Sequence, residues 1–240
     1  MWMRNGVVKL KTVTVDTDAY NLIPSRFPPV GLYDRLEGVL GSSLAALENL
    51  TNPRLKEKRR LTGATAADAE TAPRFQNWNH APFTYENPEG STFFGRWPGA
   101  LELSEELETA LAVAVAKRGR FLRRTREVAL ELDMRVFKRR VRGTFLDCTD
   151  RGHELSRPEC LDLGRQAMND NVAGLVYHSP ERASGRRLAI IDATTLSRVD
   201  QTKHFRFVWD GERISKVYDF ERAETIEPSE LAGPIVDTAA

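Results

Sequence analysis

Residues 203–218 read KHFRFVWDGERISKVY and carry a strong fold signal. On either side of Asp210-Gly211, apolar and polar residues alternate, in FRFVW before the pair and in RISKVY after it. Alternation with a period of two indicates strands with one buried face, and an Asp-Gly pair between two such runs favours a tight hairpin turn. The sequence therefore predicts strands over 203–209 and 212–218, joined by this turn.

Outward from this hairpin, the apolar pattern predicts strands and helices in an irregular order. Alternating residues indicate further strands over 13–23, 127–136, 141–147, 174–178 and 187–192. Helical spacing indicates helices over 32–50, 104–124 and 158–167, and residues 60–98 are expected to be mostly loop. This order favours an α+β fold with a mainly antiparallel or split sheet and flanking helices, rather than a doubly wound parallel sheet.

The helix expected from Ser104 to about Arg124 is the clearest in the chain. Glu105 and Glu106 would lie in its first turn and arginines in its last turn, which complements the helix dipole. Its middle part, 110–116 (ALAVAVA), contains no carboxylate. These two turns therefore bring no acidic side chain to any site.

The composition is that of a globular chain of 240 residues, long enough for one large domain. Its formal net charge is +1, so the total charge does not favour nucleic acid or an anionic membrane as a partner. Basic runs at 56–60 and 138–142 are interpreted as solvated faces. We expect a single domain over 1–220, followed by a polar C-terminal tail over 221–240.

Neither a metal site nor reactive thiols are indicated. The two cysteines, Cys148 and Cys160, form no CxxC motif, and the four histidines lack the spacing of metal ligands. The start of the chain has no apolar run long enough for export or for crossing a membrane. The expectation is a cytoplasmic protein with reduced thiols and no bound metal.

A family resemblance rests on several short stretches in a fixed order. They are YNLIPSRFPP (20–29) with GLY (31–33), HAPFT (80–84), LETALA (107–112), GLVYHS (174–179) and the closing HFRFVWDGERI (204–214). Each motif alone is weak, but together they resemble the longer bacterial RES-domain proteins over about residues 20–214. The resemblance implies a fold related to ADP-ribosyltransferases and a toxin encoded beside an Xre-type antitoxin.

The activity that this resemblance implies is the consumption of NAD+. Such proteins split the bond between nicotinamide and ribose by hydrolysis or phosphorolysis, or they pass ADP-ribose to a target. Positive charge builds on the ribose as nicotinamide leaves, so the site needs a carboxylate, a cation for the pyrophosphate and groups that hold the nicotinamide end. A homo- or hetero-oligomer is equally compatible with the resemblance.

The family places an Arg, a Tyr, a Glu and a Ser at this site, and only the Ser is kept here. The Arg position is Asn21, the Tyr position is Glu102, and the Glu position is Val113, whereas the Ser is Ser179, two residues after Tyr177. An amide cannot replace the bidentate fork that a phosphate uses, and an aliphatic side chain carries no charge. The resemblance thus implies that cleavage is reduced or lost.

Relocated charges are the alternative to lost catalysis. Arg26, Arg96 or Arg182 would then supply the cation for the phosphates, and Glu102 or Glu108 would supply the carboxylate.

Three functions follow from these possibilities. The first is an NAD+-cleaving toxin with a rearranged site. The second is a non-catalytic protein that binds an antitoxin or an active relative. The third is a module that holds a nucleotide through Tyr177 and Ser179 without cleaving it.

Overall fold

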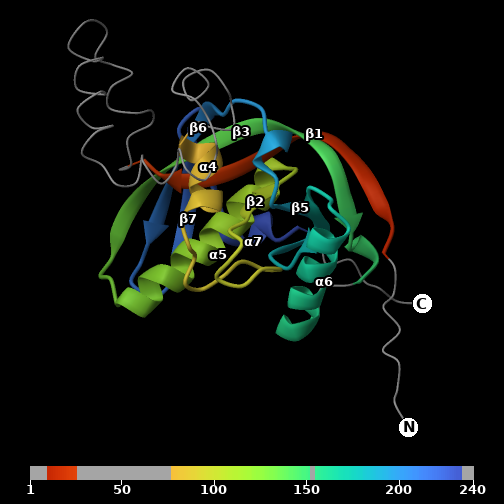
Figure 1. Ribbon diagram of the computed structural model, residues 1–240. Coiled ribbons are helices and arrows are strands. Elements are labelled where there is room, and N and C mark those ends of the chain that lie inside the picture. Colours follow the sequence, from red (N-terminus) through yellow and green to blue (C-terminus); the bar gives the residue numbers. More distant parts are fainter. Residues whose placement is uncertain (1–9, 26–76, 152–154, 234–240) are drawn as a thin grey trace, which may run out of the picture.

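A computed structural model describes residues 10–25, 77–151 and 155–233 of the chain. Within these ranges, eight strands form one sheet and the helices lie against it (Figure 1). The strands are β1 (Thr12–Pro24), β2 (Leu101–Ser104), β3 (Leu130–Asp147), β4 (Gly174–Ser179), β5 (Arg182–Ile190), β6 (Asp200–Trp209), β7 (Ile214–Asp219) and β8 (Glu224–Ile226). The helix expected over 32–50 and the candidate cation Arg26 lie outside the described residues.

The sheet is almost entirely antiparallel, as the sequence predicts for an α+β fold. Its order is β1-β2-β5-β4-β3-β6-β7-β8, and only the short β3–β4 pairing is parallel. β1 also pairs with β3 along its whole length, from Thr12 opposite Leu146 to Pro24 opposite Met134. This extra pairing closes β1, β2, β5, β4 and β3 into a circuit. Of the two arrangements expected, the mainly antiparallel sheet is therefore the one observed.

β3 differs from expectation because it is one strand of 18 residues instead of two strands joined at Arg142-Gly143. The chain stays extended through Gly143, which lies so close to the η4 turn (Ala193–Thr195) that a Cβ there would be 2.9 Å from Thr195. β3 therefore continues without a break, pairing with β1 along its length, with β6 at its N-terminal end and with β4 at its C-terminal end.

The α-helices of the described ranges are α4 (Asn77–Thr84), α5 (Leu107–Thr125), α6 (Arg157–Asn169) and α7 (Pro228–Leu231). In Figure 1, α5 runs across the strands and α6 lies farther along the sheet beside β4 and β5. α5 begins at Leu107 and not at Ser104, because Ser104 is the last residue of β2 and pairs with Arg187 and Tyr20. α4 is also a correction, since its residues fall in the stretch expected to be mostly loop.

Three groups of buried apolar side chains hold the layers together. α5 packs on β1, β3, β6 and β7 through a group that includes Leu111, Met134 and Trp209. A second group, around Val141 and Leu188, lies on the other face of the sheet. α6 packs on β4 and β5 through a third group that contains both cysteines.

The described part of the expected polar tail, residues 221–233, contains regular structure. It forms β8, which pairs with β7, and then α7, whose Leu231 is buried against α5. Arg182 donates a hydrogen bond from Nη1 to the carbonyl of Leu231, at 2.9 Å. Ile226 and Leu231 pack on this core while the polar residues between them stay in water, so the segment is anchored without burying polar groups.

Candidate functional site

Polar side chains from β2, β4 and β5 gather on the face of the sheet that carries α5 and α6. Glu102 of β2 lies opposite Ala189 of β5, and Arg187 of β5 lies opposite Tyr177 of β4. Side chains alternate along a strand, so Arg187 and Ala189 share a face, and their cross-strand partners share it with them. Strand pairing thus brings three polar residues together that are up to 85 positions apart in the sequence.

Glu102 accepts hydrogen bonds at both of its carboxylate oxygens. Its Oε1 accepts from the backbone N–H of Thr92, at 2.8 Å, and from the Thr92 hydroxyl. Its Oε2 accepts from Nζ of Lys117, at 3.1 Å, and from Nη2 of Arg187, at 2.9 Å. Two neutral donors and two cations therefore occupy this carboxylate from both sides.

These contacts keep Glu102 ionised. Burial by itself would raise the pKa of the Glu102 carboxyl, but the Arg187 guanidinium, the Lys117 ammonium and the Thr92 hydrogen bonds together hold that pKa well below its ordinary range. The Glu102 side chain is only 10% exposed and that of Arg187 only 4% exposed. The pair is a buried, charge-assisted contact and not a surface salt bridge.

Ser179 joins the same cluster through Glu181. The Ser179 hydroxyl donates to Oε2 of Glu181, at 2.9 Å, and that oxygen lies 3.6 Å from Nη1 of Arg187. The Arg187 guanidinium also lies over the ring of Tyr177, 5.3 Å from its centroid. Burial is the largest reason why the pKa of the Tyr177 hydroxyl is raised above its usual range. Arg187 therefore contacts Glu102, Glu181 and Tyr177 directly, and it is linked to Ser179 through Glu181.

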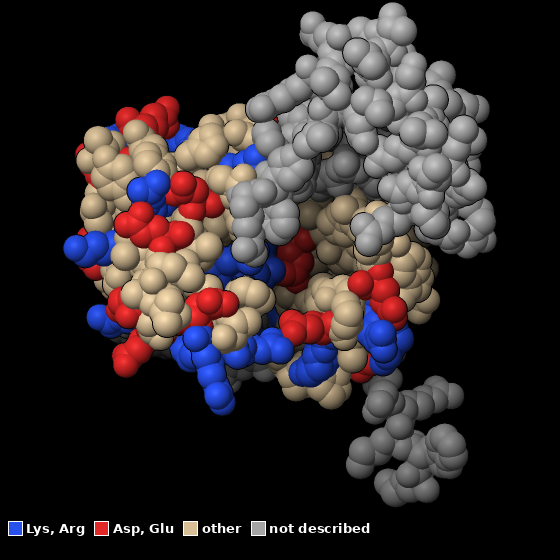
Figure 2. All heavy atoms as spheres, turned by 90° about the vertical axis from the view of Figure 1, so that its left-hand side faces the viewer, with Lys and Arg blue, Asp and Glu red and all other residues tan. Residues whose placement is uncertain are grey.

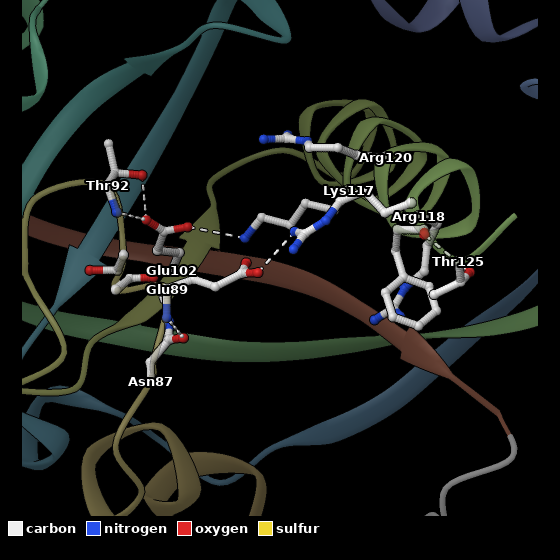
Figure 3. A pocket seen from close by; sticks show the side chains of 12 residues that line it. Asn87, Glu89, Thr92, Glu102, Lys117, Arg118, Arg120 and Thr125 are labelled. Atoms are coloured by element: carbon white, nitrogen blue, oxygen red, sulfur yellow. Dashed lines mark hydrogen bonds and ion pairs between the residues drawn. The ribbon is translucent and has the colours of Figure 1, made fainter.

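A cavity of about 680 Å³ opens beside Glu102, between α5 and the loop that precedes β2. Figure 3 shows Lys117, Arg118 and Arg120 coming from α5, with Asn87, Glu89 and Thr92 on the facing loop. Two ion pairs join these walls: Lys117 to Glu102, at 3.1 Å, and Arg124 to Glu89, at 2.9 Å. The volume is in the range of pockets that hold a nucleotide-sized ligand.

Val113 lies on the helix face that is turned toward this cluster. Thr109, Val113 and Lys117 are spaced by four and follow one stripe of α5. At one end of the stripe, Thr109 contacts β5 so closely that a Cβ on Gly185 would lie 2.2 Å from its hydroxyl. At the other end, Lys117 reaches Glu102. Val113, 8% exposed, lies between them, so the structure brings positions 102, 113 and 179 to the same region.

Asn21 does not belong to this region. Tyr20 and Leu22 of β1 face α5, so Asn21 faces the opposite side of the sheet. There its Oδ1 accepts from Nη2 of Arg139, at 2.6 Å, and Nη1 of the same guanidinium donates to Oδ1 of Asn79, at 2.7 Å. Burial lowers the pKa of Arg139 to about 9, which still leaves it protonated at neutral pH.

The candidate cations Arg96 and Arg182 contact residues outside this cluster. Arg96 is exposed on its loop and pairs with exposed Glu86, at 2.9 Å. Arg182 contacts the carbonyl of Leu231 in α7 and lies 3.8 Å from the carboxylate of Glu106, the N-cap residue of α5. Glu108 is exposed on α5 and supplies no carboxylate to the cluster. Of the relocated charges that the structure describes, Arg96, Arg182, Glu102 and Glu108, only Glu102 lies in the site.

Sequence reasoning missed Arg187, Lys117 and Glu181. A signal for Arg187 exists, because it directly precedes the apolar run Leu188–Ile190 of β5, and a charged residue that is buried with such a run requires a partner. Lys117 carries no such signal, since a lysine on a helix is normally solvated.

The described residues offer no cluster of three or more His, Cys, Asp or Glu that is able to hold a metal ion. Burial raises the pKa of Cys148 to about 12, so this thiol is not activated. Among the helices of the described ranges, none has the length and apolarity needed to cross a bilayer. The face shown in Figure 2 mixes Lys and Arg with Asp and Glu, and carries no large field of one sign.

Comparison with known proteins agrees with the motif order. The RES domain family matches residues 68–210, more than half of the chain. The chain belongs to the RES domain family. A protein of Sinorhizobium fredii (strain NBRC 101917 / NGR234), the uncharacterized protein y4oC, is 43% identical over 226 residues, which cover 92% of this chain and 96% of that one.

A more distant likeness is to a solved structure titled crystal structure of the M. tuberculosis MbcT-MbcA toxin-antitoxin complex. The identity is 12% and the TM-score 0.38, with 93% of this RES protein and 92% of that chain covered. A TM-score at this level is too low to transfer any property between the two chains.

Proposed function

We propose that this RES protein keeps a nucleotide pocket of the NAD+ type but cleaves NAD+ slowly or not at all. The observation that carries the proposal is that both carboxylate oxygens of Glu102 already accept hydrogen bonds. Of positions 102 and 113, only position 102 carries a carboxylate. A developing ribose cation needs a carboxylate with a free face and a fixed position. A carboxylate that already accepts from Thr92, Lys117 and Arg187 must give up one of these partners first.

The missing helix carboxylate strengthens this proposal. The resemblance puts a Glu at position 113, where an acidic side chain would project from the helix beside Lys117. Val113 supplies neither charge nor hydrogen bond there. Removing one preorganised electrostatic partner typically lowers a rate by about 10²–10³, so catalysis without this carboxylate is expected to be weak.

The test is NAD+ consumption by the purified full chain, with and without phosphate. We expect no loss of NAD+ above a buffer control in either condition. The matched variant exchanges the two positions, E102Y/V113E, so that one carboxylate remains near Lys117 and Arg187. Its control is E102Y/V113Q, which has the same shape without the charge.

Two results bear on the proposal directly. E102Y/V113E should consume NAD+ about 10²–10³ times faster than E102Y/V113Q, because only the former has a helix carboxylate. Rapid NAD+ loss with the unmodified chain would overturn the proposal. It would favour the second candidate, an NAD+-cleaving toxin in which ionised Glu102 beside the cavity acts as the relocated carboxylate.

A partner is part of the proposed function. A RES protein with little activity acts by binding, and the partner that the resemblance implies is an Xre-type antitoxin in the cytoplasm. Co-expression with the product of the neighbouring gene should give a complex that survives size-exclusion chromatography. Normal growth of cells that express this chain alone is the accompanying expectation, whereas growth arrest with falling NAD+ would favour the active toxin.

A further inference from the structure

The cavity beside Glu102 has one strongly cationic wall. Its α5 side carries Lys117, Arg118, Arg120 and Arg124, and among the described residues that line it the carboxylates are those of Glu89 and Glu102. Both carboxylates are already paired, with Arg124 and Lys117. The charges of Lys117 and Arg124 are thus already compensated, and Arg120 is the cation of this wall whose charge a bound anion would neutralise.

The helix dipole does not account for these cations. Cations stabilise a helix C-terminus only within its last turn, and Arg123 and Arg124 already occupy that turn of α5. Lys117, Arg118 and Arg120 lie one to two turns earlier. Arg120 is exposed and makes no ion pair with any residue in the described part of the chain. Its place at the cavity wall thus has no explanation in the stability of the helix.

The same wall contains an aromatic side chain and the facing wall contains hydrogen-bonding groups. Phe121, 46% exposed, lines the cavity next to Arg120. Large aromatics that stay exposed in a cavity are typical of surfaces on which a planar ring stacks. On the opposite side, Ser91 and Asn87 supply polar groups. An anionic ligand with an aromatic part fits this combination better than a simple ion does.

We infer that this cavity binds the diphosphate of a nucleotide through Arg120 and the neighbouring Lys117, with a ring of the ligand against Phe121. The inference rests on the proposed function for the class of ligand, and it assigns the phosphate-binding cations to α5. The resemblance assigns that role to position 21, but Asn21 lies on the opposite face of the sheet. Guanidinium groups suit this role because they bind phosphate oxygens in a bidentate manner.

Equilibrium binding to the full chain tests the inference, measured by calorimetry with ADP-ribose, pyrophosphate and adenosine as separate probes. The test variant is Arg120→Glu, which reverses a charge at the cavity wall. The control is Arg123→Glu, which makes the same change on the same helix at a residue that contacts the carbonyl of Glu212 and does not line the cavity. Both arginines are exposed, so both variants are expected to fold.

ADP-ribose should bind at least tenfold more weakly to R120E than to the parent, and R123E should change the dissociation constant less than twofold. The affinity of the parent should also fall as salt is raised, and that of R120E should fall less. Pyrophosphate should show the same pattern as ADP-ribose, whereas adenosine binding should be insensitive to R120E. If pyrophosphate alone follows this pattern and ADP-ribose does not bind, the ligand is a free phosphate compound and the nucleotide assignment is overturned.

Equal weakening by R120E and R123E would overturn the inference, because the effect would then come from overall charge. Absence of any binding of ADP-ribose and pyrophosphate to the parent at millimolar concentration would overturn it as well. These outcomes are distinguishable from failure of the proposed function. NAD+ cleavage by the parent would contradict slow cleavage and leave the phosphate site intact, whereas unchanged binding by R120E would remove the phosphate site and leave slow cleavage intact.

Discussion

The Arg187 guanidinium on β5 lies 2.9 Å from the Glu102 carboxylate on β2, and 96% and 90% of the two side chains is hidden from solvent. This contact joins β2 to its neighbour β5 through their side chains and holds Glu102 in reach of Lys117 on α5. Removing one partner of a buried ion pair leaves the other charge buried without compensation. The stability of the sheet and the chemistry of the site therefore depend on the same two side chains.

Replacing Glu102 by Gln should destabilise the protein by about 3 kcal/mol at neutral pH, because Arg187 loses its buried counter-charge. The pKa of Glu102 is depressed in the folded state, so its contribution is fully present above the ordinary carboxyl pKa of 4.5 and declines as the pH falls below it. The measurement is urea unfolding of parent and variant at several pH values.

The control for this change is Glu86→Gln, since the Glu86–Arg96 pair is exposed on both sides. It should alter the free energy of unfolding by less than about 1 kcal/mol. A difference between parent and E102Q that stayed constant from pH 7 to pH 3 would show that the charge of Glu102 is not what stabilises the fold.

Asn21→Arg, the change that restores the family residue, should destabilise the protein by roughly 3 kcal/mol. The new guanidinium would lie against that of buried Arg139, whose Nη2 is 2.6 Å from the Asn21 amide oxygen. Asn21→Asp is the matched variant, because it places a counter-charge at the same point and should be tolerated better. Thermal unfolding of the parent, N21R and N21D proteins ranks their stabilities. An N21R protein as stable as the parent would mean that the side chain at position 21 points to the other face of the sheet.

Gly164→Ala should destabilise the protein by about 3 kcal/mol, despite the higher helix propensity of Ala. A Cβ at this position of α6 would lie 2.0 Å from the carbonyl oxygen of Phe93, a backbone atom that cannot move aside alone. Gly95→Ala is the control, since nothing lies within 4 Å of its Cβ position. Chemical denaturation should separate the two variants clearly, and equal midpoints would contradict the close approach of α6 to the loop before β2.

Leu231→Ala should lower the free energy of unfolding by about 2–3 kcal/mol, because Leu231 is 4% exposed and packs in the core beneath α5. Val128→Ala removes apolar carbons at a position that is 79% exposed, and it should have almost no effect. Both are measured by thermal and urea unfolding. An unchanged free energy of unfolding in Leu231→Ala would show that this segment does not pack on the core.

Local patterns along the sequence determined much of the fold. The hairpin of β6 and β7, the opening strand β1 and the helices α5 and α6 follow from alternation, helical spacing and turn residues, because each of these signals acts between near neighbours in the chain. The order of short motifs also indicated the RES family. The notable local failures, α4, α7 and the unbroken β3, are elements whose existence depends on contacts with distant residues.

Only the tertiary structure decided which residues form the site. Glu102 and Arg187 are 85 positions apart, and they meet because β2 pairs with β5 in one register. A register shifted by one residue would turn each side chain to the other face. On β1 the same alternation puts Asn21 on the face opposite to Tyr20 and Leu22. Spacing in the sequence says which residues alternate along one strand, but the face that a strand turns toward α5 is set by the packing of the whole sheet.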